Sequence, residues 1–266
     1  MSLFYDRIVR VSVGPEGSIG KEWQDLRIGF SVNKTSSSEP NKAEVYIYNL
    51  SDDSVGFINQ KNNIIQVFAG YKEIGEERIF IGDIDTVFTQ SSSADRITKI
   101  EAGDGENAFI AARVNKNYNS AVGLNEILKY LADTLGLGVV STTENIQLPH
   151  GISLFGTTRQ ALDHVSKSLG LEWSIQNNLL TVNVAGEGDG QSTVLLSPSS
   201  GLIGSPSRSV DSVKLTCLLN TRISPRTTIS VDADDFSGEY RVDKCRHFGD
   251  NGFDGAFYTE IEGVQL

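Results

Sequence analysis

The chain has 266 residues, of which 39% are hydrophobic and 21% charged, and its 23 basic and 34 acidic residues give a net charge of −11. This is the composition of a globular protein, and the length suits two or three domains that need no disulfide or metal to hold a core. The acidic balance argues against a nucleic-acid-binding protein, because contacts to phosphates require clustered lysine and arginine.

The sequence predicts a protein that folds in a cytoplasm. Residues 1–7 have no basic stretch followed by an apolar run, so they are not a secretory signal. No window comes near the roughly 18 apolar residues of a membrane-spanning helix, so we expect no membrane binding by the chain itself. Cys217 and Cys245 are expected to be buried thiols; the alternative, a disulfide between them, requires an oxidising compartment.

The first hundred residues alternate between apolar and polar side chains with the period of β-strands. Turn signals at residues 14–17, 36–40 and 75 separate the alternating runs. Ser51 precedes two aspartates, a pattern typical of an N-cap, and predicts a short helix near residues 52–59. The predicted strands are residues 8–13, 26–32, 43–48, 64–71, 79–90 and 97–102. Many strands at short spacing predict a barrel or a sandwich.

The period then changes to that of amphipathic helices. Apolar residues along one helical face run from Leu124 to Leu135, and Gly136 is placed to end this helix in the left-handed conformation. A second helix begins at Thr157, where the sequence up to Gln160 matches a capping box. The similar ends of the two helices would fit a helical solenoid. A strand follows each helix, however, and two copies are too few for a solenoid, so we predict a small α+β domain.

The predicted α+β domain closes with a hairpin and a linker. The hairpin strands, residues 172–175 and 179–182, turn through Asn177 and Asn178, which tolerate positive φ. The glycine-rich residues 185–192 form the clearest linker in the chain. After the linker the strand pattern returns at residues 213–218, 228–231, 240–247 and 257–264.

None of the candidate motifs for phosphate or calcium binding is complete. Residues 14–21 are similar to a phosphate-binding loop, but Pro15 stands at the first glycine position and Glu22 replaces the magnesium-binding hydroxyl. Residues 250–255 open like a calcium loop, but Ile261 stands where the bidentate glutamate is required. A hairpin turn is the better interpretation of this acidic segment.

The remaining candidates are isolated acids and histidines. Asp83 and Asp85 lie on one face of an extended segment, roughly 6–7 Å apart at the backbone, and this spacing could suit acid–base catalysis on a sugar. No tryptophan lies near the pair, and nearby acids are common in any sequence. A second acidic group could hold a cation, although a solvated loop is the commoner structure; it consists of Asp232, Asp234 and Asp235. The histidines share no metal-ligand spacing, and His164 is expected at the surface; they are His150, His164 and His247.

Three stretches together resemble the phage tail hub family, which includes late-control and baseplate hub proteins. The first is residues 41–51 with 68–71 and 79–84, the second is residues 156–175, and the third comprises residues 201–206, 218–225, 238–242 and 247–250. Each stretch is a strand-and-turn motif with little chemistry. The resemblance rests on their joint order, which covers nearly the whole chain.

The resemblance implies a homotrimer at the distal end of a phage tail. In such hubs two barrel-like domains per chain resemble the tail-tube subunit, so three chains offer six similar units to a hexameric tube. The other end receives a spike or central fibre, and other baseplate proteins are further partners. The implied location is the virion, after assembly in the host cytoplasm. Because the chain ends at Leu266, just after its last strand, a spike or lysozyme domain is expected to be a separate protein.

The sequence as a whole therefore predicts a mainly β fold with an α+β insert. We expect a tail-tube-like β-barrel domain at residues 1–110, an α+β domain at 111–185 and a second β-barrel domain at 194–266, with the two barrels similar and side by side. We expect no catalytic, cofactor-binding or metal-binding residue. Two other functions stay open: a tail-associated glycan or peptidoglycan hydrolase, and a soluble ligand-binding β module.

The net charge leads to one more expectation. A trimer of this chain carries three times the charge of the protomer, and a tail hub must let DNA pass without binding it. Carboxylates repel phosphates, whereas lysine and arginine bind them. We therefore expect channel-facing loops rich in aspartate and glutamate, with basic residues turned outward or toward partners.

Overall fold

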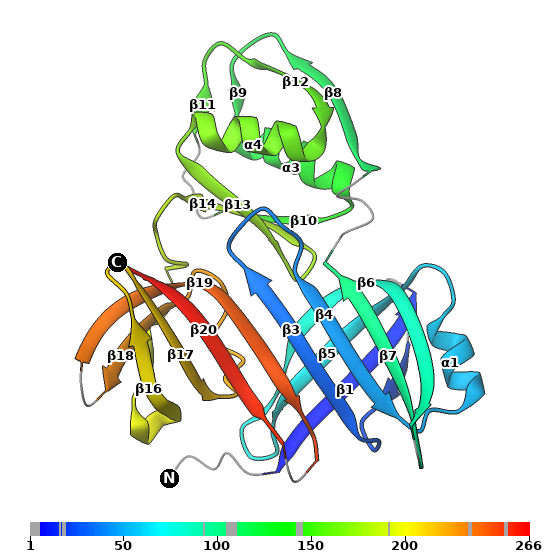
Figure 1. The fold of residues 1–266 in the computed structure, drawn as a ribbon. Helices are drawn as coiled ribbons and strands as arrows, with labels where there is room; N and C mark the ends of the chain where they lie inside the picture. The colour runs from blue at the N-terminus through cyan, green and yellow to red at the C-terminus, as the bar shows by residue number, and fades with distance from the viewer. Residues whose placement is uncertain are drawn as a thin grey trace.

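The computed structural model describes residues 6–15, 17, 20–92, 94–104, 111–141, 146–190, 192–233, 236–252 and 255–266. Strands make up most of these residues, and a smaller unit of helices and strands interrupts them (Figure 1). The expected mainly β fold with an α+β insert is therefore confirmed. None of the helices in these ranges has the length and apolar surface that a membrane span requires.

The N-terminal region is a β structure with one short helix. Ser51 caps that helix as predicted, because its hydroxyl accepts a hydrogen bond from the backbone N–H of Ser54. Every strand predicted here is present, and only β2 was missed, because three residues are too few to establish a period. The elements are β1 (Arg7–Pro15), β2 (Lys21–Trp23), β3 (Ile28–Thr35), β4 (Lys42–Tyr48), α1 (Asp52–Ile58), β5 (Asn63–Tyr71), β6 (Gly75–Ser92) and β7 (Asp95–Gly103).

The middle unit combines two helices with one three-stranded sheet and two two-stranded sheets. Gly136 ends the first helix at a φ of 68°, and Thr157 and Gln160 form the predicted capping box of the second. Figure 1 shows this unit beyond one end of the strands of the large sheet. Its elements are β8 (Arg113–Tyr118), β9 (Val122–Gly123), α3 (Leu124–Leu135), β10 (Gly138–Ser141), β11 (Gln147–Leu148), β12 (Ile152–Thr157), α4 (Thr158–Ser168), β13 (Leu171–Gln176) and β14 (Leu179–Val184).

The C-terminal region returns to β structure. Its long hairpin of β19 and β20 turns through the acidic segment that follows Asp250, as predicted in preference to a calcium loop. Its elements are β15 (Val194–Leu196), η1 (Pro198–Ser200), β16 (Leu202–Arg208), β17 (Ser212–Leu218), β18 (Thr228–Ala233), β19 (Phe236–Asp250) and β20 (Phe257–Gln265).

One large sheet runs through both β regions. Its strand order is β16-β17-β20-β19-β3-β4-β7-β6-β5-β1-β2, and β18 and β15 extend from β19 as a branch. The N-terminal part curls so that β1 and β5 lie behind β3 and β4 (Figure 1). The strand pairs among the described residues do not close into a ring, so the two predicted barrels are not confirmed. The physical reason in the N-terminal region is that β3 pairs with β4 on one side and with β19 of the other region on its second side, so this side is not available to close the ring.

Three apolar cores lie under these layers, one in each part of the chain. The first core also takes in Leu219 and Phe257 from the C-terminal region. Phe257 packs edge to face against Phe30 and Tyr71, with ring centroids 5.9 and 5.3 Å apart. The two β regions are therefore joined by side-chain packing as well as by backbone pairing.

Shortening Phe257 tests this packing. The side chain exposes 1% of its surface, so Phe257→Ala should lower the free energy of unfolding by about 3–5 kcal/mol, through lost burial and the cavity left behind. Urea denaturation measures the change. The half-buried neighbour Tyr258 is the control, since Tyr258→Ala should cost clearly less. Equal costs for the two variants would contradict a key role for Phe257 in the first core.

Candidate functional site

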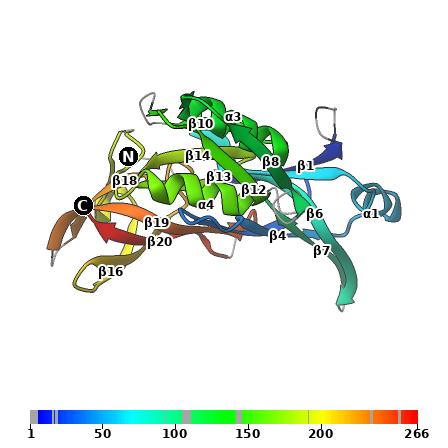
Figure 2. The same ribbon diagram turned by 90° about the horizontal axis from the view of Figure 1, so that it is seen from above.

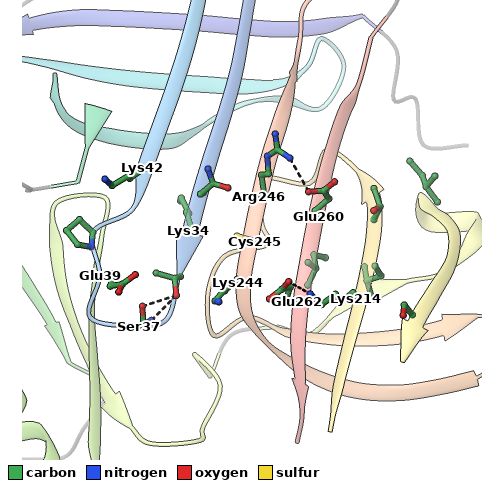
Figure 3. Close-up of a pocket in the computed structure, with 18 of the residues that line it drawn as sticks. Lys34, Ser37, Glu39, Lys42, Lys214, Lys244, Cys245, Arg246, Glu260 and Glu262 are labelled. Carbon is green, nitrogen blue, oxygen red and sulfur yellow. Dashed lines mark hydrogen bonds and ion pairs between the residues drawn. The ribbon is translucent and has the colours of Figure 1, made fainter. Parts of the chain in front are cut away.

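One face of the large sheet is uncovered and carries polar side chains. A groove of about 930 Å³ lies on this face, across β3, β19, β20 and β17. Figure 3 shows the groove with the turn after β3 on one side and β16 on the other. Its lining is mostly charged and hydroxyl side chains, and Ile203 is among the few apolar ones.

Charged side chains in the groove alternate across the strands. Glu262 lies in register between Lys214 on one side and Lys244 on the other, and its carboxylate is 2.5 Å from the Lys214 ammonium. One row further, Glu260 is 3.5 Å from Arg246. Both of these acids therefore have a cationic neighbour, so the two charges are mixed along these strands rather than gathered in patches of one sign. Over the whole lining of the groove the basic residues outnumber the acidic ones, five to three.

The same balance extends along the uncovered face from β17 to β7. The acidic and basic side chains that alternate outward on these six strands are nearly equal in number, seven acids and six bases. The acids are Glu44, Asp95, Glu101, Glu239, Asp250, Glu260 and Glu262, and the bases are Lys42, Lys99, Lys214, Arg241, Lys244 and Arg246. Most of the acid excess of the chain therefore lies elsewhere.

A buried polar cluster lies behind the groove, where β3 meets β19. Lys34 and Cys245 face each other in register, and the His247 ring lies 3.8 Å from the Cys245 sulfur and 2.9 Å from the Thr259 hydroxyl. Burial lowers the pKa of the Lys34 ammonium and raises the pKa of Cys245 to about 12. Burial and the nearby Lys34 lower the pKa of His247 to about 3. The imidazole is therefore neutral and the thiol protonated, so the cluster is structural.

The paired acids Asp83 and Asp85 lie at a β-bulge. The ladder between β6 and β7 shifts register between Ile84 and Thr86, which leaves Asp85 as the extra residue of the bulge. That both acids lie on one face stays a prediction. Neither acid lines the groove.

The other predicted site residues also lack a shared site. Cys217 and Cys245 are buried free thiols, as expected, while His150 and His164 are exposed on the middle unit. Asp250 accepts hydrogen bonds from Arg27 and from the N–H of Gly252, which leaves it a structural role in the turn. No group of residues suited to a metal occurs in the described ranges. Asp234, Asp235 and Asp254 lie outside the described residues.

The segment that is similar to a phosphate loop has a different structure. The strands on either side of it, β1 and β2, pair antiparallel, with Val13 in register with Lys21, while Glu16, Ser18 and Ile19 lie outside the described residues. A phosphate loop would need a helix after the strand, so that its N-terminus could hold the anion.

The middle unit meets the large sheet through polar groups. Strand β13 alternates, so that Leu171, Trp173 and Ile175 enter the core of the middle unit while Glu172 and Gln176 face the sheet. Both polar residues bond to the body of the protein. The contact between the units is therefore made at two polar corners, which we call the Arg226 corner and the Asp104 corner.

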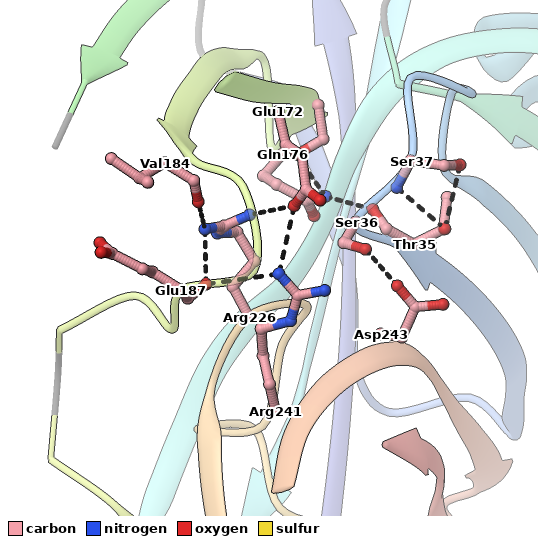
Figure 4. A network of polar contacts seen from close by, with 11 residues as sticks. Thr35, Ser36, Ser37, Glu172, Gln176, Val184, Glu187, Arg226, Arg241 and Asp243 are labelled. Carbon is pink, nitrogen blue, oxygen red and sulfur yellow. Dashed lines mark hydrogen bonds and ion pairs between the residues drawn. The ribbon is translucent and has the colours of Figure 1, made fainter. Parts of the chain in front are cut away.

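The Arg226 corner holds the segment that leaves the middle unit (Figure 4). The Arg226 side chain exposes 4% of its surface and lies 2.7 Å from the Glu172 carboxylate. The guanidinium also donates to the carbonyls of Val184 and Glu187, at 2.8 and 2.5 Å. Arg241 lies 3.2 Å from the same carboxylate. The predicted linker thus connects the two units, but one buried arginine fixes its start.

The Asp104 corner holds the turn between β13 and β14. The Asp104 carboxylate accepts hydrogen bonds from the N–H groups of Asn177 and Asn178, at 2.7 and 2.8 Å, and burial raises its pKa. The predicted Asn177–Asn178 turn has φ values of 54° and 63°. The side-chain amide of Asn41 donates a hydrogen bond to the side-chain oxygen of Gln176, at 3.0 Å. Sequence patterns missed both corners, because a lone Asp104 or Arg226 gives no periodic signal.

The chain was compared with known proteins. No protein-family model matches it, and neither does any curated protein. Solved structures do match. A tail protein from Neisseria meningitidis MC58 aligns with a TM-score of 0.72 at 15% identity, over 98% of this chain and 97% of that protein. The 43 kDa tail protein of prophage MuSo2 from Shewanella oneidensis aligns with a TM-score of 0.70 at 11% identity, over 97% of this chain and 98% of that one.

A third match comes from a secretion system. It is the E. coli c3393 protein, a type VI secretion component described as similar to the T4 phage tail proteins gp27 and gp5. It aligns with a TM-score of 0.62 at 10% identity, over 96% of this chain and 76% of that protein. The chain therefore has the fold of phage tail proteins, as the resemblance of its sequence to tail hubs predicted.

The buried imidazole predicts a pH dependence of stability. The unfolded chain binds a proton on His247 below about pH 6.5, whereas the folded chain binds it only near pH 3. The free energy of unfolding should therefore fall as the pH drops through this window, by at most about 1.4 kcal/mol per pH unit. Between pH 6 and pH 4 the native protein should lose about 2 kcal/mol more than His247→Gln. Equal losses in urea titrations would contradict this, and the exposed His164→Gln should behave like the native protein.

The two polar corners should open together. Glu172→Gln removes the charge that Arg226 and Arg241 share and so weakens the Arg226 corner. The hydrogen bonds from Asn177 and Asn178 to Asp104 should then open more often as well. Amide hydrogen exchange at Asn177 and Asn178 should then be about tenfold faster, while exchange within α3 stays unchanged.

A control variant sits in the same unit. Glu126 is an exposed acid on α3, and Glu126→Gln should leave exchange at the two asparagines unaltered. Faster exchange throughout α3 in Glu172→Gln would instead mean that the middle unit itself unfolds.

Proposed function

We propose that this chain is a structural subunit of a phage tail baseplate, a hub that forms a homotrimer between a hexameric tail tube and a trimeric spike or central fibre. One observation carries the proposal beyond the shared fold. The two β regions repeat one strand order inside one common sheet, so a single chain presents two related units side by side.

The repeat is visible in the pairing of the strands. The N-terminal region has the path β3-β4-β7-β6-β5-β1, and the C-terminal region has the path β16-β17-β20-β19-β18-β15. Numbered along the chain, the strands take corresponding places in the two paths. The long strands β6 and β19 even carry their bulges at corresponding positions, Asp85 and Asp243. Two features depart from the repeat. Strand β2 pairs with β1 at the end of the N-terminal path and has no counterpart among the described C-terminal strands. Strand β15 runs parallel to β18, whereas β1 runs antiparallel to β5.

The repeat supports the trimer through symmetry. A threefold assembly meets a sixfold tube without mismatch when each protomer offers two near-equivalent surfaces. Three copies of this chain offer six such units. We accordingly propose functional units at residues 1–110, 111–185 and 194–266, with the outer two in the ring and the middle one held at its side by the two polar corners.

The hub would provide a passage for DNA, and we propose that the uncovered sheet face lines it. If this face lines the passage, it neither repels DNA strongly nor binds it strongly. Its acidic and basic side chains neutralise one another rather than leaving a row of free cations. This differs from the acid-rich channel expected from net charge alone. That expectation concerned loops, and for them it stays a prediction.

The partners and the location follow from the same proposal. The hub would contact the tail tube protein, the spike or central fibre protein and other baseplate proteins, in a virion assembled in the host cytoplasm. We propose no catalytic role, because Asp83 and the bulge residue Asp85 both lie outside the groove. No observation favours the hydrolase or the ligand-binding module.

The oligomeric mass tests the proposal. Light scattering on the purified chain should give three times the protomer mass of 28.9 kDa, and addition of the tube protein should give a larger complex. A monomer that does not bind the tube would refute the hub function. A trimer that binds neither tube nor spike would leave the assembly but remove the adaptor role.

A further inference from the structure

The strand pairing that joins the two β regions within the chain indicates how two copies of the chain could pair. In the chain, residues 244–250 of β19 pair antiparallel with residues 29–35 of β3. This seam joins β19, the long bulged strand of the C-terminal repeat, to β3, the first strand in the path of the N-terminal repeat. The corresponding strands of the other repeat are β6, which is also long and bulged, and β16, which is also first in its path.

Those two remaining strands have an open side. The first half of β6, residues 75–83, pairs with β5, and the ladder with β7 begins at Asp83. Beyond the bulge the partner strand of β6 is β7 alone among the described residues. Strand β16, in the position that corresponds to β3, pairs with β17 alone in the same ranges. The two open sides lie at opposite limits of the path from β16 to the distal half of β6.

We propose that the distal half of β6, residues 85–92, pairs antiparallel with β16 of a second copy of this chain. The proposal rests on the homotrimer proposed above and names its interface. The two open sides are different surfaces, so the contact is head to tail, and head-to-tail contacts close into a ring when the rotation permits. The internal junction supplies that rotation, because the next repeat is placed by the same strand pairing.

The composition of the β6 segment suits this pairing. Residues 85–92 contain threonine, valine and phenylalanine, which favour strands, and they contain no lysine or proline to discourage pairing. Phe88 exposes 59% of its surface there. Phe88 takes the position of Arg246 in the internal junction, where that arginine donates to Ser31 across the seam at 3.0 Å.

The repeat also fixes the register. In the internal seam Phe248 lies opposite Ser31. Counting from the bulges, Gln90 corresponds to Phe248, since Thr86 and Lys244 both directly follow a bulge and both lie opposite a glutamate.

The partner position follows from the adjoining strands. Ser31 lies opposite Glu44 and Ser207 lies opposite Lys214, while Glu44 and Lys214 lie opposite the corresponding glutamates of β7 and β20. Ser207 therefore corresponds to Ser31. The inferred seam places Gln90 of one copy opposite Ser207 of the next copy.

Engineered cysteines test this register. The double variant Gln90→Cys with Ser207→Cys should form disulfides between copies on mild oxidation and run as a covalent trimer on a denaturing gel without reductant. The native Cys217 and Cys245 are buried and will not compete. The control, Gln90→Cys with Lys214→Cys, moves the second cysteine one strand further from the seam, by about 4.8 Å. Its cross-linked fraction should be at least about tenfold lower, because disulfides need closely placed Cα atoms.

Light scattering on the same variants separates the two proposals. A trimeric mass with no specific cross-link means that the copies assemble through other surfaces, which overturns the inferred seam and leaves the trimer intact. A monomeric mass overturns both. Equal cross-linking in the variant and its control also overturns the seam, since it would reflect random collision.

Discussion

The pairing of β3 with β19 is the constraint on which the rest of this structure depends. It joins strands from the two ends of the chain, more than 200 residues apart, and so makes one sheet out of two regions. Because β19 occupies the second side of β3, β3 cannot also close the N-terminal strands into a ring. The pairing also aligns the outward side chains of six strands into one face and brings Phe257 into the first apolar core. Fold, surface and packing across the two regions all follow from this one ladder.

Backbone pairing and side-chain packing join the β regions, whereas the middle unit is held by polar contacts. The difference has an energetic reason. An apolar seam is stabilised over its whole area, while a polar joint depends on a few groups whose desolvation must be offset by good geometry. At the Arg226 corner the Nε atom is buried without a partner and the residue has a φ of 76°, so this joint carries some strain. The two β regions are therefore joined over a large area, whereas the middle unit is attached to them at a few polar contacts.

Much of the fold could be predicted from the sequence, because local rules decide it. The period of two located the long strands, and the caps at Ser51, Gly136 and Thr157 fixed the helices. Long-range pairing could not be predicted this way: nothing in the residues of β3 indicates that its neighbour is β19. The same limit applies to the bulge at Asp85, because only the register of β6 with β7 reveals it. Arg226 and Asp104 were missed because each acts through backbone atoms of distant segments.

The bulge in β16 has a mechanical consequence. Its ladder with β17 is interrupted between Ile203 and Ser207, and Pro206 in the gap has no N–H to donate. Strand β3 carries no such interruption and pairs over its whole length. A ring built from this chain would thus alternate three strong β3–β19 seams, each within one chain, with three weaker seams between copies, set 120° apart. Under load such a ring would separate first at the seams between copies. It would come apart into three intact protomers, and no domain would unfold.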